Sequence, residues 1–223
     1  MRSVLPWSFS SYSAYQTCPR QFYEVKIAKN WVEEQSEAIL WGNTVHKAFE
    51  DNIKVGTPLP PTVQRFEKVL DSYKRLPGEA HAEIELAFTK DLTPTGFWDE
   101  DAYCRGKGDL VKVNGNKSAN IDWKTGKVKP NSLQLDLMAV QIFIKFPQVE
   151  VSNNIFVWLQ QPSKPTVEVR RREELPKLLE QFEEGVQDME WSELHDVWPE
   201  KPSGLCNGWC PVKTCRHWKP KRR

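Results

Sequence analysis

The stretch IDWKTGK, residues 121–127, decides how the rest of the chain is interpreted. In a β-strand alternate side chains share a face, so Asp122 and Lys124 point one way while Ile121 and Trp123 point toward a core. A carboxylate and an ammonium two residues apart at the end of a strand form a compact unit. The carboxylate can hold a divalent cation, and the lysine can orient a water molecule or neutralise charge on a phosphate.

Strand-like and helix-like patterns alternate on both sides of this stretch. Two-residue periodicity predicts a meander of three strands, followed further on by two more strands, at 82–89, 103–113, 119–125, 154–161 and 166–170. Three- and four-residue spacing of apolar residues predicts helices at 37–52, 62–76, 132–146 and 173–191, after a short N-terminal helix capped by Ser10 or Ser11. The order favours an α/β fold, and no linker is long enough to separate two domains.

Composition excludes some classes of protein and leaves others open. A chain of 223 residues can fold as one α/β domain without disulfides. The 31 basic and 30 acidic residues give a net charge of +1, so the total charge does not predict a nucleic-acid partner. The longest apolar block, LMAVQIFI, is far shorter than the roughly 20 residues of a membrane-spanning helix. With no signal-peptide pattern in residues 1–12, we expect a soluble cytoplasmic protein without membrane contacts.

Further candidate metal ligands come from other segments. Asp109 lies in the string RGKGDLV and becomes the second carboxylate if its strand pairs with 119–125 as a hairpin. Glu85, in the first strand of the meander, is a third candidate, and Glu83 on the same face competes with it. His46 lies one helical turn after Gly42, whose missing side chain would let the helix approach another backbone.

Together these motifs resemble the RecB-type branch of the PD-(D/E)XK nuclease superfamily. The similar strings, in order, are SFSSYSAYQTCPRQFYE (8–24), WGNTVHKAFED (41–51), EIELAF (83–88), RGKGDLV (105–111), IDWKTGK (121–127) and QLDLM (134–138). Each string is weak alone, but their order and spacing make the resemblance specific. One departure is Met138, which stands where the family usually has a tyrosine. The alternative is that IDWKTGK is a surface hairpin with solvated carboxylates.

The resemblance implies a central mixed sheet flanked by helices and a metal-dependent hydrolysis of phosphodiester bonds in DNA. The implied metal ligands are His46, Asp109, Asp122 and the main-chain carbonyl of Trp123, and the implied catalytic residues are Lys124, Glu85 and Gln134. Mg²⁺ or Mn²⁺ is expected because an oxygen-rich site suits hard cations. The substrate would be single- or double-stranded DNA ends, in recombination, repair or viral DNA processing, with a recombinase or helicase as a potential partner. If the protein is viral, it would work in the host cytoplasm.

Four of the five cysteines lie near the two ends of the chain. Cys18, Cys206, Cys210 and Cys215 resemble the [4Fe-4S] ligands of AddB subunits and of CRISPR-associated adaptation nucleases, and Cys104 is left over. The alternative is a tetrahedral zinc site formed by the same four thiolates. The expected arrangement is one nuclease domain over 1–223, with a core at 37–191 and an iron-sulfur region formed by 10–30 and 200–223. The chain also resembles phage-type exonucleases.

Aromatic and basic residues accompany the cysteines. Trp209, Trp218, Arg20 and Lys219 are candidates for contact with nucleic acid, although tryptophans beside cysteines more often pack around a metal site. Two other functions remain open: a catalytically silent nucleic-acid-binding or assembly module, and a zinc-stapled structural protein. Retention of Asp122 and Lys124 argues against the silent module.

Overall fold

The computed structural model describes residues 5–32, 35–129 and 133–221. The chain divides into two compact units. Residues Ser36–Gln181 form the first, here called the sheet unit, and Met1–Gln35 together with Phe182–Arg223 form the second, the terminal unit. The expectation of a single domain over the whole chain stays a prediction.

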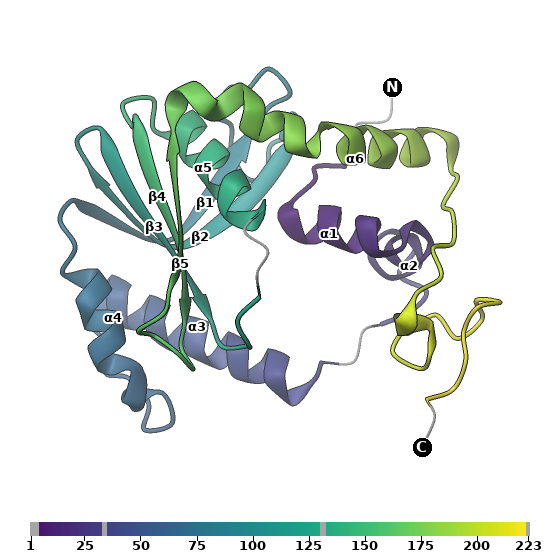
Figure 1. Cartoon of the computed structure of the whole chain (residues 1–223), viewed down its shortest axis with the longest axis horizontal. Helices are drawn as coiled ribbons and strands as arrows, with labels where there is room; N and C mark the ends of the chain where they lie inside the picture. The colour runs from purple at the N-terminus through teal and green to yellow at the C-terminus, as the bar shows by residue number, and fades with distance from the viewer. Residues whose placement is uncertain (1–4, 33–34, 130–132, 222–223) are drawn as a thin grey trace. The chain divides into compact units, whose positions relative to one another are not determined.

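The sheet unit is built on five strands in the order β1-β2-β3-β4-β5 (Figure 1). They are β1 (Glu79–Phe88), β2 (Cys104–Asn114), β3 (Lys117–Lys124), β4 (Val151–Trp158) and β5 (Thr166–Arg171). All neighbours are antiparallel except β3 and β4, which are parallel with Trp123 opposite Val157. The parallel pair requires a crossover, and helix α5 (Leu133–Lys145) provides it. The expected α/β fold with a mixed sheet flanked by helices is therefore confirmed.

Helices cover the two faces of this sheet (Figure 1). On one face lie α3 (Glu37–Val55), the 3₁₀ turn η2 (Gln64–Phe66) and α4 (Glu67–Lys74). Their core holds buried apolar residues including Phe49, Leu70, Leu110, Ile121 and Trp123. On the other face Leu135 of α5 packs with Phe156 and Trp158. The alternation in β3 thus places Ile121 and Trp123 in the core, as the sequence predicts.

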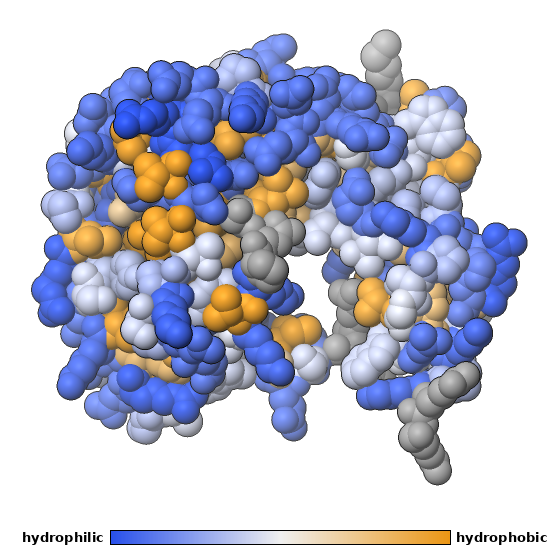
Figure 2. Space-filling view, viewed as in Figure 1, coloured by the Kyte–Doolittle hydropathy of each residue, from blue (hydrophilic) through white to orange (hydrophobic). Residues whose placement is uncertain are grey.

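Most of the visible surface is polar, and apolar side chains gather in small patches over β4 and β5 (Figure 2). The edge strand β5 contributes Val167 and Val169, both about half exposed. Among the described residues, no helix combines the length and the apolar character needed to cross a bilayer.

The terminal unit joins segments from the two ends of the chain. It contains α1 (Phe9–Thr17), α2 (Pro19–Phe22), the π-helical turn η1 (Tyr23–Ile27), the later part of α6 (Leu175–His195) and the 3₁₀ turn η4 (Gly204–Cys206). Tyr15 anchors α1 to α6, because its hydroxyl lies 2.7 Å from Ser192 Oγ and donates to the Asp188 carbonyl at 2.8 Å.

Several helices begin or end at other residues than the sequence predicts. Ser8, and not Ser10 or Ser11, caps α1, and it forms a capping box with Ser11. Helix α3 continues to Val55 and stops at Gly56, which adopts the left-handed conformation. The expected helix at 62–76 shortens to α4 after η2, and the last helix is preceded by the 3₁₀ turn η3 (Arg172–Glu174).

Candidate active site

The candidate site forms where strands β2 and β3 separate. Their register ends at Leu110 opposite Ile121, and beyond this pair the two strands diverge. The main-chain N–H of Trp123 donates to Asp109 Oδ2 at 2.8 Å, so a side chain takes the place of a ladder carbonyl. The Trp123 ring lies in the core, with edge contacts to Phe49 and Tyr73. Asp109 is therefore fixed in the gap by the backbone of the strand that carries Asp122 and Lys124.

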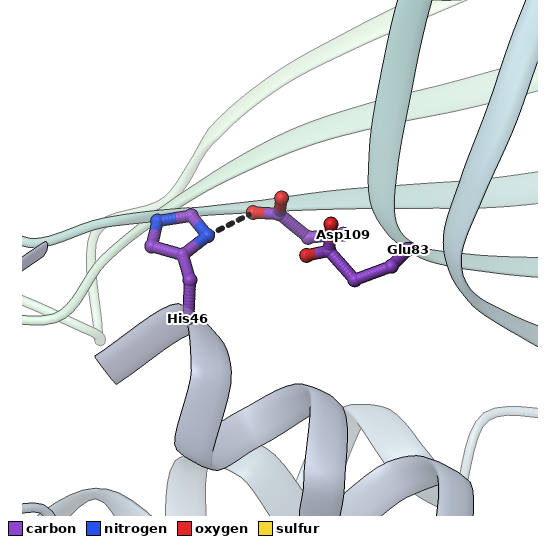
Figure 3. A group of neighbouring side chains, drawn as sticks. All are labelled: His46, Glu83 and Asp109. Carbon is purple, nitrogen blue, oxygen red and sulfur yellow. Dashed lines mark ion pairs between the residues drawn. The ribbon is translucent and has the colours of Figure 1, made fainter. Parts of the chain in front are cut away.

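Three side chains from three elements converge on this gap. His46 extends from α3 toward Asp109, and its Nδ1 lies 3.2 Å from Asp109 Oδ2 (Figure 3). Glu83 of β1 joins them, and ligand atoms of the three residues all lie within 4.8 Å of one another. Glu83 has a φ of 50°, between the paired positions Ala82–Leu110 and Ile84–Gly108. We call His46, Glu83 and Asp109 the ligand group.

The structure brings Glu83, and not Glu85, into the ligand group. The carboxylate of Glu85 lies 3.3 Å from Lys107 Nζ, and both side chains are about half exposed. Regular alternation puts Glu83 and Glu85 on one face, so it does not predict which of the two is the metal ligand. The useful signal is the hairpin register, in which Glu83 and Asp109 both lie between the pairs Ala82–Leu110 and Ile84–Gly108. Gly42 faces Thr125 Oγ1, so the close approach expected of this glycine is to a side chain and not to a backbone.

A second set of contacts holds Asp122. Lys124 Nζ lies 2.8 Å from Asp122 Oδ1 and 3.0 Å from Oδ2. Gln134 of α5 donates from Nε2 to Asp122 Oδ2 at 2.9 Å and accepts from Lys124 Nζ at 3.0 Å. The ammonium also lies 4.5 Å from the centre of the Phe156 ring. These contacts form a closed triangle of side chains beside the ligand group.

Burial and crowded charge shift the pKa values at the site. Burial, followed by the charge of Asp109, raises the pKa of Asp122 to about 6, although Lys124 and His46 act in the opposite direction. Burial and then Asp109 also raise the pKa of Glu83. Burial alone would lower the pKa of His46, but its hydrogen bond and attraction to Asp109 outweigh this and raise it. The carboxylates thus repel one another when all are ionised.

This arrangement suits a divalent cation. The ligand group offers two carboxylates and one imidazole, and Asp122 adds a third carboxylate that feels the charges of Asp109 and His46. Such oxygen-rich donor sets fit hard cations such as Mg²⁺ and Mn²⁺. A bound cation would also offset the mutual repulsion that raises the carboxylate pKa values.

Open space adjoins the ligand group. A pocket beside His46 is lined by residues of α3 and by the segment that follows Lys124, namely Ala38, Ile39, Trp41, Gly42, Asn43, Thr125 and Gly126.

Met138, which stands where the family tyrosine is expected, is buried in α5. It supplies no hydroxyl there.

The four predicted cluster cysteines lie in the terminal unit. Cys18, Cys206, Cys210 and Cys215 are free thiols that line one pocket. Burial, and then the proximity of the other three thiols, raises the pKa of Cys210 despite a backbone hydrogen bond that lowers it. Among the described residues, no three sulfur atoms lie within 4.8 Å of one another. The expected closed four-cysteine centre is therefore not formed. Cys104 is buried elsewhere, in β2.

The four residues of the terminal unit that the sequence suggests for nucleic-acid contact differ in how accessible they are. Trp209 is 65% exposed, with Lys221 Nζ 3.8 Å from its ring centre. Trp218 donates to the Cys210 carbonyl at 3.1 Å, and the Lys219 N–H donates to the Cys206 carbonyl at 2.8 Å. Arg20 forms an ion pair with Glu24 at 2.5 Å. Trp218 therefore packs within the cysteine loop, and Trp209 is the accessible ring of the pair.

Comparison with known proteins identifies the family. Residues 6–215 match the model of the PD-(D/E)XK nuclease superfamily, so the chain belongs to this superfamily. No curated protein matches. The crystal structure of "Putative exonuclease" from Eubacterium rectale has a TM-score of 0.54 and 14% identity, over 98% of this chain and 90% of that one. SSO0001 has a TM-score of 0.42 and 13% identity over 96% and 88% of the two chains, too distant to support an argument. The first likeness shows the fold alone.

Proposed function

We propose that this protein is a Mg²⁺- or Mn²⁺-dependent deoxyribonuclease of the RecB/AddB-type branch that degrades DNA from its ends. The observation that carries this proposal is the convergence of His46, Glu83 and Asp109 beside the Asp122–Lys124–Gln134 triangle, in a chain of the PD-(D/E)XK superfamily. DNA is the substrate class that this family membership favours.

The ligand group and Asp122 would hold the cation, with the Trp123 carbonyl as a further ligand. When bound, the ion would polarise the scissile phosphate and make a water molecule more acidic. Asp109 is fixed for this task by Trp123 and His46, and Asp122 by Lys124 and Gln134. Glu83 replaces Glu85 in this proposal, because Glu85 contacts Lys107 instead.

Lys124 and Gln134 have different roles in this proposal. The Lys124 ammonium is held at the site by both oxygens of Asp122 and by Gln134 Oε1, where its charge would orient the attacking water or neutralise charge on a phosphate oxygen. Gln134 bridges Asp122 and Lys124 and so keeps both at a fixed separation. We therefore assign Lys124 to catalysis and Gln134 to positioning.

Within this function, we propose that the enzyme acts on DNA ends as an exonuclease. The Eubacterium rectale structure bears the name exonuclease, and the resemblance to RecB- and AddB-type nucleases points in the same direction. The proposed setting is DNA recombination, repair or viral DNA processing, with a recombinase or helicase as the candidate partner.

A [4Fe-4S] cluster in the terminal unit is a further part of the proposal. All four cysteines face one pocket, which supports a shared cofactor. Four thiolates in one pocket would also suit a tetrahedral zinc ion, so the iron and zinc content of the protein distinguishes the two cofactors.

The test uses protein purified without oxygen and end-labelled linear and closed circular DNA, with Mn²⁺ or EDTA. We expect Mn²⁺-dependent loss of the linear substrate, an intact circle, and inactivity of D122A and K124A. Cleavage that survives both substitutions would remove the proposed site. Cleavage of the circle would replace exonuclease by endonuclease action, and DNA binding without any cleavage would indicate the silent module. A colourless, zinc-loaded protein would remove the iron-sulfur cluster.

A further inference from the structure

The loop between β1 and β2 presents an exposed aromatic pair that the proposed catalytic site does not use. Phe97 and Trp98 contact each other edge to face, with ring centres 5.0 Å apart. Trp98 is 76% exposed, more than the core packing of a tryptophan would allow. The guanidinium of Arg105 lies 5.7 Å from the Phe97 ring centre and 5.3 Å from that of Trp98, and Lys107 Nζ lies 5.5 Å from Phe97. We call Phe97, Trp98, Arg105 and Lys107 the aromatic platform.

The basic members of the aromatic platform extend from β2 away from α5. Gln141 of α5 donates to Cys104 Sγ, and a Cβ on Gly106 would collide with the same Gln141 side chain, so Cys104 and Gly106 face α5 and Arg105 and Lys107 point away from it. Lys107 also lies close enough to the ligand group for its charge to lower the pKa of Glu83, against the stronger effects of burial and Asp109.

The loop that carries the two rings is held in place by its own hydrogen bonds. Asp99 accepts from the Gly96 N–H at 2.8 Å and from Thr95 Oγ1 at 3.1 Å, and Asp101 accepts from Thr95 Oγ1 at 2.7 Å. Arg105 Nη2 donates to the Asp99 carbonyl at 3.3 Å. These contacts hold the Asp99 and Asp101 carboxylates within the loop. They also preorganise the Trp98 ring, which lowers the entropy cost of binding a flat partner.

We propose that the aromatic platform binds the single-stranded segment of DNA next to the scissile phosphate, with Trp98 stacked on a base and Lys107 and Arg105 at phosphates. The proposal rests on the proposed nuclease function and makes single-stranded ends its preferred substrate. Base–aromatic stacking is tolerant of sequence, whereas bases in a duplex are already stacked on one another and offer no free face inside the helix. Positive charges along β2 complement the backbone that would lead into the ligand group.

Glu85 then has a defined role in this proposal. Its carboxylate lies 3.3 Å from Lys107 Nζ and competes with a phosphate for that ammonium. Removing the carboxylate charge should strengthen DNA binding, which is the opposite of the effect expected if Glu85 were a metal ligand.

The experiment measures fluorescence anisotropy of labelled single-stranded DNA, the same strand with abasic residues, and a blunt duplex, in Ca²⁺ without Mg²⁺ or Mn²⁺. Wild type should prefer the base-containing strand. W98A should bind it roughly 5- to 150-fold more weakly, the loss expected for one base–aromatic stack, and should bind the abasic strand as wild type does. W98F should recover most of the affinity. The matched control is W191A, which removes another half-exposed tryptophan from the acidic helix α6.

Two further variants test the charges of the platform. K107A should reduce the salt dependence of binding by about 0.7 in the log–log slope, the share of one phosphate contact on a single strand. E85Q should bind at least as tightly as wild type. If wild type cleaves DNA but W98A binds base-containing and abasic strands with wild-type affinities, the platform is wrong and the nuclease assignment stands. If wild type neither binds nor cleaves DNA, both fail.

Discussion

The main-chain N–H of Trp123 donates to the carboxylate of Asp109 at 2.8 Å, across the point where strands β2 and β3 part. This bond satisfies a backbone donor beside a fully buried ring and at the same time orients a carboxylate of the ligand group. The same hydrogen bond therefore serves the fold and the candidate site, because β3, the strand that carries Asp122 and Lys124, also orients the Asp109 carboxylate.

Two substitutions of Asp109 should separate these roles. The amide oxygen introduced by D109N can still accept from the Trp123 N–H, whereas D109A leaves that donor without its partner. Both variants lose the charge, so their difference isolates the hydrogen bond. We expect D109A to be less stable than D109N by about 1–3 kcal/mol in urea unfolding. Equal stability would show that water or another group replaces the carboxylate at no cost.

Glu83 and Glu85 form a matched pair for testing the ligand group. A ligand present at 100 times its dissociation constant stabilises the folded state by about 2.7 kcal/mol, which is measurable as a rise in melting temperature. Mn²⁺ should stabilise wild type and E85Q to a similar extent, and E83Q much less. If Mn²⁺ instead stabilised E83Q like wild type and E85Q much less, Glu85 would be the metal ligand. Its proposed competition with a DNA phosphate for Lys107 would then also be wrong.

The stability of the metal-free protein should fall as pH rises from about 4 to about 6. The pKa of Asp122 is raised in the folded state to about 6, so the folded protein binds a proton there that the unfolded chain has released. The loss is on the order of 3 kcal/mol at most, since each unit of pKa shift corresponds to about 1.4 kcal/mol. Urea unfolding in EDTA, with wild type and D122N compared across this range, measures it.

D122N should flatten this part of the pH profile, because it removes the titrating group. Mn²⁺ should act in the opposite direction, giving more stabilisation as pH rises, since the ligands must be deprotonated to bind it. A wild-type profile that is parallel to that of D122N would contradict the raised pKa.

The cysteines should fall into two classes. C206S and C210S should lose iron and melt at lower temperature, since a cluster that joins Cys18 to Cys206 closes a loop of about 190 residues, worth on the order of 5 kcal/mol in the chain-entropy model. C104A is the matched control, because Cys104 is buried in β2 and contacts Gln141. It should keep full iron content. Iron retained in C206S, or lost in C104A, would overturn the assignment of the ligands.

Much of the fold follows from periodicity in the sequence. The alternation in IDWKTGK places Ile121 and Trp123 in the core and Asp122 with Lys124 on the other face, as observed. Helix α3 and the β1–β2–β3 meander also lie close to their predicted ranges. Helix starts are harder to predict, because several serines near residue 8 compete as caps and only the backbone conformation of Ser8 suits the role.

The choice of Glu83 over Glu85 required the structure. Strict two-residue alternation treats the two positions alike, but Glu83 has a left-handed backbone and its carboxylate lies within 4.8 Å of Asp109. Periodicity in the sequence does not predict the aromatic platform either. Phe97 and Trp98 lie in a loop, and they contact Arg105 and Lys107 only because β1 pairs with β2.

Mn²⁺-dependent degradation of end-labelled linear DNA by wild type and D109N tests the central claim most directly. D109N is the sharpest variant because it should keep the hydrogen bond to Trp123 and hence the fold. The account predicts degradation by wild type in Mn²⁺ but not in EDTA, and a rate at least roughly 100-fold lower in D109N at an unchanged fold. A folded D109N that degrades DNA at the wild-type rate would contradict it.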